Sequence, residues 1–158
     1  MIAFANSNFA TDVNDQRSTT GYIITLGGSV VSCKSKKQGS TTLSSTEAEY
    51  VALSQCACEL KFLVMLMKEI RKRIKLPIIL REDNTGAIFL TNNDVKGQRT
   101  KHIDTRYHFV RELVAKGELK VKYTRSERNP ADVMTKKLGE EKFTMFSEMI
   151  LSGKFPVS

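Results

Sequence analysis

The chain has 158 residues, and 25 Lys and Arg against 17 Asp and Glu give it a net charge of +8. This length suits one domain with one core, and 41% hydrophobic residues with 27% charged residues exclude disordered and collagen-like chains. The basic excess favours a polyanion as partner. Nucleic acid is preferred to a membrane, because Lys61 and Lys68 interrupt the longest apolar stretch and the first residues lack the basic region of a signal peptide.

The first half of the chain predicts three strands and a long helix. Segments rich in Val, Ile and Phe, separated by turn-forming residues, predict strands over 2–9, 21–26 and 29–35. Ser44 to Glu47 has the spacing of a capping box, and apolar residues follow at helical intervals down to Ile70. We therefore expect the helix to begin at Ser44.

The second half alternates strands with helices. An apolar run over 77–82 predicts a strand buried on both faces, and 84–90 follows as a short helix. A third helix with an apolar face ends near Gly117, and 119–123 alternates as a half-buried strand.

Two more helices complete the prediction, one opened by Asn129-Pro130 and one over 140–151. The order βββαβααβαα predicts an α/β domain over 1–153 with a tail over 154–158. Cys33, Cys56 and Cys58 lack the spacing and the nearby histidines of a zinc site, so we expect reduced thiols in an intracellular protein. We also expect a monomer.

Glu49 is an unusual carboxylate because it falls on the apolar stripe of the long helix, in line with Leu53, Cys56 and Leu60. Burying an unpaired carboxylate costs roughly several kcal/mol, so such a group needs a cation, a hydrogen-bond donor or a metal. Glu47, by contrast, is explained as the partner of Ser44 in the capping box.

Asp83 and Asp132 each allow a structural interpretation. Asp83 follows a buried strand, where ligands of open α/β sheets bind, but it also precedes a helix and suits its N-cap. Asp132 lies in the first turn of the helix opened at Asn129, where the helix dipole favours a negative charge. Together with Glu49, however, the two aspartates could converge on one sheet edge and hold Mg²⁺ between them.

The chain resembles the ribonuclease H domain of Ty1/copia-type retrotransposon Pol polyproteins over nearly its whole length. The motifs that carry this resemblance are, in chain order, DQRSTTGY (15–22), SKKQ (35–38), LSSTEAEY (43–50), EDN (82–84), TKHID (100–104), YHF (107–109) and ADVMTK (131–136). The family fold that it implies is a mixed five-stranded sheet, with three antiparallel strands and then two parallel ones, flanked by helices.

The resemblance also implies an endonuclease that cuts the RNA strand of RNA/DNA hybrids with two Mg²⁺ ions, or Mn²⁺ in their place. The implied metal ligands are Glu49, Asp83 and Asp132, with a first aspartate on the opening strand. The family usually has Ser-Asp-Ala-Asp-Trp-Ala there, whereas this chain has ANSNFA (5–10), so that Asn6 replaces the aspartate. Asn offers one neutral carbonyl oxygen, and we therefore expect impaired cleavage.

Two groups of basic residues predict a surface for the hybrid: Lys34, Lys36 and Lys37 on the third strand, and Lys96, Arg99, Lys101 and Arg106 around the third helix. The resemblance adds Asn84 and His102 to the expected nucleic-acid contacts. Solvated surface charge is the alternative for any single lysine, and helix capping is the alternative for His102.

Two functions follow from the sequence. The first is an impaired ribonuclease H, with the polymerase domain of a reverse transcriptase as a further partner. The second is a catalytically inactive pseudo-ribonuclease H that binds nucleic acid or another protein. The replacement of both family aspartates by Asn6 and Asn8 motivates the second function.

Overall fold

The architecture is a mixed five-stranded sheet with the strand order β3-β2-β1-β4-β5. The computed structural model describes residues 1–10, 14–93 and 101–155. Three antiparallel strands, β1 (Ile2–Asn8), β2 (Thr19–Leu26) and β3 (Ser29–Lys37), form one half of the sheet. In the other half, β4 (Ile78–Glu82) runs parallel to β1, and β5 (Leu119–Tyr123) runs parallel to β4. The predicted strand arrangement is confirmed.

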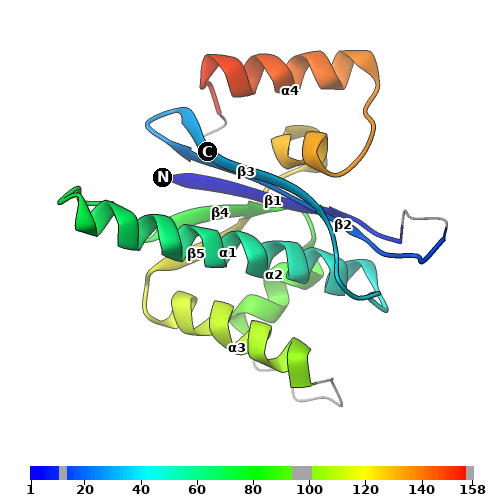
Figure 1. Cartoon of the computed structure of the whole chain (residues 1–158), viewed down its shortest axis with the longest axis horizontal. Helices are drawn as coiled ribbons and strands as arrows, with labels where there is room; N and C mark the ends of the chain where they lie inside the picture. The colour runs from blue at the N-terminus through cyan, green and yellow to red at the C-terminus, as the bar shows by residue number, and fades with distance from the viewer. Residues whose placement is uncertain (11–13, 94–100, 156–158) are drawn as a thin grey trace.

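Helices cover both faces of the sheet (Figure 1). On one face lie α1 (Ser45–Glu69), α2 (Thr85–Asn92) and α3 (Lys101–Ala115). On the other face lie α4 (Glu140–Ser152) and two short 3-10 turns, η1 (Ser126–Arg128) and η2 (Pro130–Met134). Alternate residues of the strands therefore supply two separate cores, a large one under α1 and a smaller one under α4 and η2.

The starts of α1 and α2 are set by side-chain caps. The Ser44 hydroxyl accepts the backbone N–H of Glu47 at 3.1 Å, and the Glu47 carboxylate accepts the N–H of Leu43 at 2.8 Å. The predicted capping box is thus present, although Glu47 reaches one residue further back than expected. The cap of α2 is Asn84, whose side-chain oxygen accepts the N–H of Ala87 at 2.9 Å. Asp83 is not the cap, so its structural interpretation is wrong.

Two predictions about the C-terminal part need correction. The segment opened by Asn129-Pro130 is the short 3-10 turn η2, and not an α-helix. The predicted tail also begins too early, because Phe155 is buried and its ring lies 5.6 Å from the ring of Phe4. An aromatic side chain buries a large apolar area, which is why the packed domain extends at least to Phe155.

Helix α1 is long and apolar enough to cross a membrane by length and composition, contrary to the sequence prediction. Half of the residues in its most apolar window are buried inside the fold. Leu53, Cys56 and Leu60 pack in the large core against β1 and β2. The burial is that of a core helix, which explains the hydropathy without a membrane.

Gly21 allows η2 to lie directly on the sheet. It pairs with Asn6 across the β1–β2 ladder, and a Cβ at this position would lie 2.5 Å from Thr135 Cγ2 and 2.7 Å from Met134 Cβ. Only glycine fits this approach, and the contact brings η2 next to Asn6.

The change Gly21→Ala should therefore force η2 away from the sheet and destabilise the fold by about 1–3 kcal/mol through overpacking. Urea unfolding of purified protein measures this loss. Gly39→Ala is the matched control, because nothing lies within 4 Å of a Cβ at Gly39. Equal stability of the two variants would contradict the tight contact between η2 and β2.

Candidate metal centre

The candidate site lies where the central parallel strands end. Phe4 of β1 pairs with Arg81 of β4, and Asn6 and Asp83 each follow two residues later. They therefore lie at the same level of the sheet, at the carboxyl ends of β1 and β4, where ligands of α/β sheets bind. The N-terminal half of α1 packs against β1 and brings Glu49 to this edge.

Three carboxylates gather at this edge, from two different elements. Ligand oxygens of Glu49, Glu82 and Asp83 lie within 4.8 Å of one another. Glu49 is 8% exposed and Glu82 is fully buried, while Asp83 is partly exposed and accepts a hydrogen bond from the Ser126 hydroxyl at 2.5 Å. Like charges this close repel one another unless protons or a cation neutralise them.

Glu82 uses only one of its two carboxylate oxygens within the protein. Its Oε1 accepts the backbone N–H groups of Asp83 and Asn84, both at 3.1 Å, and so holds the junction between β4 and α2. Its Oε2 is buried and has no hydrogen-bond partner, and the same is true of Glu49 Oε2. Two buried, unpartnered carboxylate oxygens therefore belong to one cluster.

Burial and mutual repulsion disfavour the ionised forms of both glutamates. Burial, followed by the charge of Asp83, raises the pKa of Glu49 from 4.5 to about 8. Burial also raises the pKa of Glu82 well above its ordinary value, and the charges of Glu49 and Asp83 raise it further. Without a cation, Glu49 thus keeps its proton at neutral pH.

Asp132 has a different environment, in which each of its oxygens already has a partner. It is fully buried in η2, and its Oδ1 accepts a short hydrogen bond from the Asn6 amide. Lys136 Nζ lies 2.9 Å from Oδ1, and Lys142 Nζ of α4 lies 2.6 Å from Oδ2. An amide and two ammonium groups therefore neutralise and solvate this carboxylate.

Neighbouring side chains position Asn6 and Asp132 against each other. The Asn6 amide also donates to the Thr135 hydroxyl at 3.2 Å. Asn129, which is fully buried, donates to the Ala5 carbonyl at 2.8 Å and accepts the N–H of Ala131 at 3.2 Å. Asn129 thus caps η2 and fastens it to β1 beside Asn6.

The structure divides the predicted ligand set into two groups. Glu49 and Asp83 lie together as expected, whereas Asn6 and Asp132 form a separate hydrogen-bonded pair. Sequence reasoning missed Glu82, Lys136 and Lys142. Glu82 could have been found, because a glutamate inside a strand predicted to be buried on both faces requires a partner for the same reason as Glu49.

The structure describes only some of the residues that the sequence predicts to contact nucleic acid. Lys34, Lys36 and Lys37 lie on the exposed part of β3, where Lys37 forms an ion pair of 2.8 Å with Asp15. Asn84 caps α2. Arg99 and Lys96 lie outside the described residues, and the structure does not describe the side chains of Lys101 and His102.

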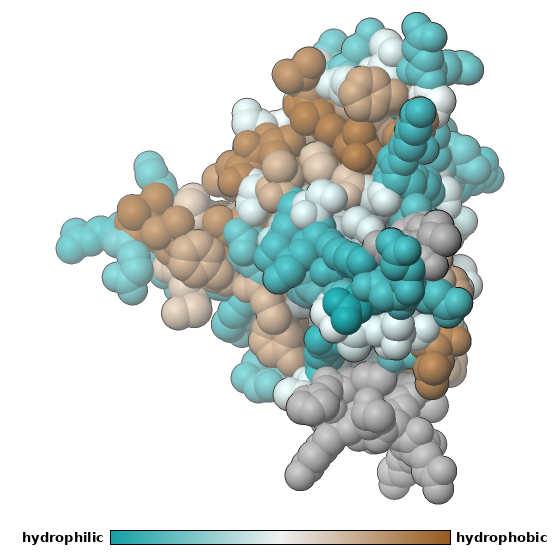
Figure 2. All heavy atoms as spheres, turned by 45° about the vertical axis from the view of Figure 1, so that its right-hand side comes forward, coloured by the Kyte–Doolittle hydropathy of each residue, from teal (hydrophilic) through white to brown (hydrophobic). Residues whose placement is uncertain are grey.

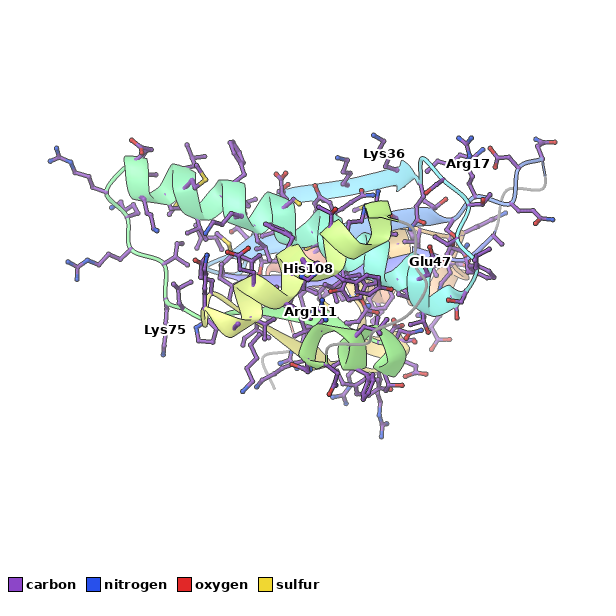
Figure 3. The ribbon with its side chains drawn as sticks, turned by 90° about the horizontal axis from the view of Figure 1, so that it is seen from below. Arg17, Lys36, Glu47, Lys75, His108 and Arg111 are labelled. Atoms are coloured by element: carbon purple, nitrogen blue, oxygen red, sulfur yellow. The ribbon has the colours of Figure 1, made fainter. Side chains whose placement is uncertain are left out.

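The surface around the sheet edge is polar. In Figure 2 the molecule is turned so that the right-hand side of Figure 1 comes forward. Hydrophilic side chains gather over the middle of this face, with apolar areas above them and to their left. Arg17 and Lys36 project at the same end of the molecule as Glu47, in the first turn of α1, whereas Lys75 lies at the opposite end (Figure 3). Basic side chains therefore flank the end of α1 that carries Glu49.

The acidic cluster fits a hard divalent cation. Such ions prefer carboxylate oxygens, and the unpartnered Glu49 Oε2 and Glu82 Oε2 are oxygens of this type. Asp132 fits a cation less well, because a metal would first have to displace Lys136 or Lys142. The side chains thus support metal binding at Glu49, Glu82 and Asp83.

The raised pKa of Glu49 predicts that stability depends on pH when EDTA removes divalent ions. Between pH 4.5 and about 8, folded Glu49 keeps a proton that the unfolded chain releases, so the unfolding free energy falls as pH rises. One such proton contributes a slope of up to about 1.4 kcal/mol per pH unit. Urea unfolding at several pH values should show a shallower slope for Glu49→Gln, and an unchanged slope would contradict the pKa assignment.

The contact between Asn6 and Asp132 predicts a metal-dependent effect of Asn6→Asp. This change replaces a hydrogen-bond donor by a second carboxylate, so it should destabilise the metal-free protein by about 1–3 kcal/mol. Mg²⁺ or Mn²⁺ should restore part of the loss by lying between the two carboxylates. Thermal unfolding with EDTA and with Mn²⁺ measures both effects. Asn8→Asp is the control, because it adds the same charge to the same strand two residues further along, and an equal response of both variants would argue against the pair.

Comparison with known proteins relates this chain to retrotransposon polyproteins. The chain is 38% identical over 156 residues to the retrovirus-related Pol polyprotein from transposon RE2 of Arabidopsis thaliana, which covers 99% of the chain. It is 36% identical over 147 residues, or 93% of the chain, to the corresponding polyprotein from transposon TNT 1-94 of Nicotiana tabacum. The chain spans 11% of the length of each of these polyproteins. No protein-family model matches it.

Solved structures share the fold at low sequence identity. LC11-RNase H1 in complex with an RNA/DNA hybrid has a TM-score of 0.62 and 18% identity, covering 85% of this chain and 92% of that protein. The foamy viral protease-reverse transcriptase in complex with an RNA/DNA hybrid has a TM-score of 0.60 and 14% identity, covering 90% of this chain and 20% of that protein. The chain therefore has the ribonuclease H fold and is homologous to one segment of Ty1/copia-type retrotransposon Pol polyproteins.

Proposed function

We propose that this domain is a metal-dependent endoribonuclease that binds RNA/DNA hybrids and cleaves their RNA strand slowly. The observation that carries this proposal is the acidic cluster of Glu49, Glu82 and Asp83, with two buried and unpartnered oxygens, at the sheet edge of a ribonuclease H fold. A bound Mg²⁺ or Mn²⁺ ion would activate water and stabilise the leaving oxygen of a phosphodiester.

The protein's own residues prepare this chemistry by position and charge. Ser126 and the backbone of the β4–α2 junction orient Asp83 and Glu82, so that little reorganisation is needed when a cation arrives. Asn6 contributes an amide where the family has a carboxylate, and that amide points its N–H at Asp132. The loss of this negative charge is our reason for expecting slow cleavage.

The hybrid would bind across the face that carries the acidic edge. Exposed Lys34 and Lys36 on β3, together with Arg17, would pair with phosphates, while contacts to 2′-hydroxyls would distinguish RNA. Arg99, Lys101, His102 and Asn84 remain predicted contacts. We further propose that the domain acts as an intracellular monomer beside the polymerase domain of a reverse transcriptase.

A second candidate function is binding of the hybrid without cleavage. The neutralisation of Asp132 by Asn6, Lys136 and Lys142 favours it, because the fourth family carboxylate is then unavailable to a metal. Binding in this case needs the basic face alone. Both candidate functions involve binding of an RNA/DNA hybrid, and they differ only in whether the RNA strand is then cleaved.

Cleavage of an end-labelled RNA/DNA hybrid in Mg²⁺ or Mn²⁺ tests the proposal. We expect weak cleavage by the natural chain, at least 10-fold faster cleavage by Asn6→Asp, and none by Asp83→Asn. Fluorescence anisotropy in EDTA measures hybrid binding separately.

The outcomes separate the two functions. Hybrid binding without cleavage by the natural chain, combined with cleavage by Asn6→Asp, would establish the binding module instead. Absence of hybrid binding by both proteins would reject both candidates. Asn8→Asp serves as the control for an added negative charge on β1.

A further inference from the structure

Glu82 has one carboxylate oxygen more than it needs to hold the junction between β4 and α2. One oxygen is sufficient to accept the two N–H groups of Asp83 and Asn84. The other oxygen, Oε2, is buried without a hydrogen-bond donor, and one carboxylate oxygen of Glu82 lies within 4.8 Å of an oxygen of Glu49. A buried carboxylate normally has all its acceptor positions satisfied, since an unsatisfied charged group costs roughly several kcal/mol.

The size of the cluster suits coordination of one ion. The three ligand oxygens lie within 4.8 Å of one another. Oxygens on opposite sides of Ca²⁺ lie about 4.6–5.2 Å apart, and those on opposite sides of Mg²⁺ about 4.0–4.2 Å apart. The cluster is therefore no wider than the coordination sphere of Ca²⁺, and a contraction of at most about 0.8 Å would bring it to that of Mg²⁺.

The fourth carboxylate of the family pattern, Asp132, is surrounded by groups that repel a cation. Asp132 accepts the Asn6 amide and lies in ion pairs with Lys136 and Lys142, whose charges face the same carboxylate. A second ion between Asn6 and Asp132 would have to displace Lys136 from the Asp132 Oδ1 atom that faces Asn6, and it would gain only a neutral oxygen from Asn6.

Building on the proposed function, we propose that Glu82 is a metal ligand and that Glu49, Glu82 and Asp83 bind a single divalent cation. Glu82 supplies the negative charge that Asn6 no longer supplies, but from β4 and on the side of the sheet under α1. The natural chain thus binds one ion, where the family pattern predicts two.

Calorimetric titration of the purified chain with Mn²⁺, without nucleic acid, tests this assignment. We expect one site in the natural chain and a 10- to 100-fold weaker Kd for Glu82→Gln. Gln keeps an oxygen that can accept the N–H groups of Asp83 and Asn84, so the fold should persist. Glu127→Gln is the matched control, because Glu127 is exposed in the neighbouring turn η1, and its Kd should remain within 2-fold of the natural value.

Adding Asn6→Asp should raise the stoichiometry from one ion to two. A second ion in the natural chain would overturn the single-ion assignment. A Kd for Glu82→Gln equal to that of the Glu127→Gln control would overturn the role of Glu82.

A measurement on the natural chain covers the case in which Glu82→Gln fails to fold. The ¹³C resonance of the Glu82 side-chain carboxyl should shift on addition of Mg²⁺, together with those of Glu49 and Asp83. Shifts of Glu49 and Asp83 without a shift of Glu82 would remove Glu82 from the ligand set.

Failure of this assignment is distinguishable from failure of the proposed function. Metal titration needs no hybrid, whereas anisotropy and cleavage test the hybrid directly. One Mn²⁺ ion bound through Glu82 in a chain that neither binds nor cuts hybrid would support the ligand assignment and reject the nuclease. Cleavage that is unaffected by Glu82→Gln would support the nuclease and reject the ligand assignment.

Discussion

The parallel pairing of β1 with β4 in the middle of the sheet is the constraint on which the site depends. Because these strands run side by side in the same direction, Asn6 and Asp83 end at one edge although 77 positions separate them in the sequence. Helix α1 adds Glu49 from below, and η2 adds Asp132 from above because Gly21 leaves room for it. A shift of β1 by one residue in this pairing would turn Asn6 to the opposite face of the sheet, away from Asp132.

The two halves of the edge solve the problem of buried charge in different ways. Asp132 receives its counter-charges from within the protein, through lysines on its own segment and on α4. Glu49 and Glu82 receive none from within hydrogen-bonding reach, and a proton or a cation from solvent must neutralise them. One half thus carries its own counter-charges, whereas the other half depends on protons or cations from solvent.

Much of the fold could be predicted from local patterns, since strand alternation and the Ser44 cap are properties of short segments. Glu49 was identified because a carboxylate interrupts an apolar stripe. For Asp83 the sequence allows both a cap and a metal ligand, and the structure assigns the cap of α2 to the neighbouring Asn84. The role expected for Asn6 came from the family resemblance, and the strand alone would not have indicated it.

The rest depended on contacts between distant segments. Lys142 belongs to a different helix from Asp132, and no local spacing predicts that its Nζ reaches Oδ2. Glu82 was missed because the other residues of the strand are mostly apolar. That its second carboxylate oxygen is buried without a hydrogen-bond partner is evident only from the three-dimensional structure. The short turn η2 was read as a helix because its Asn-Pro start is common to both.

The hydrogen bond between Asn6 and Asp132 has an evolutionary consequence. Aspartate at both positions would hold two like charges in a buried space, a strained arrangement of the kind that functional sites retain at the expense of stability. Asparagine at position 6 makes a favourable contact with Asp132 instead, so it favours folding. Selection for a well-folded domain would then favour asparagine at this position, and aspartate would be favoured only where metal-dependent chemistry itself is selected.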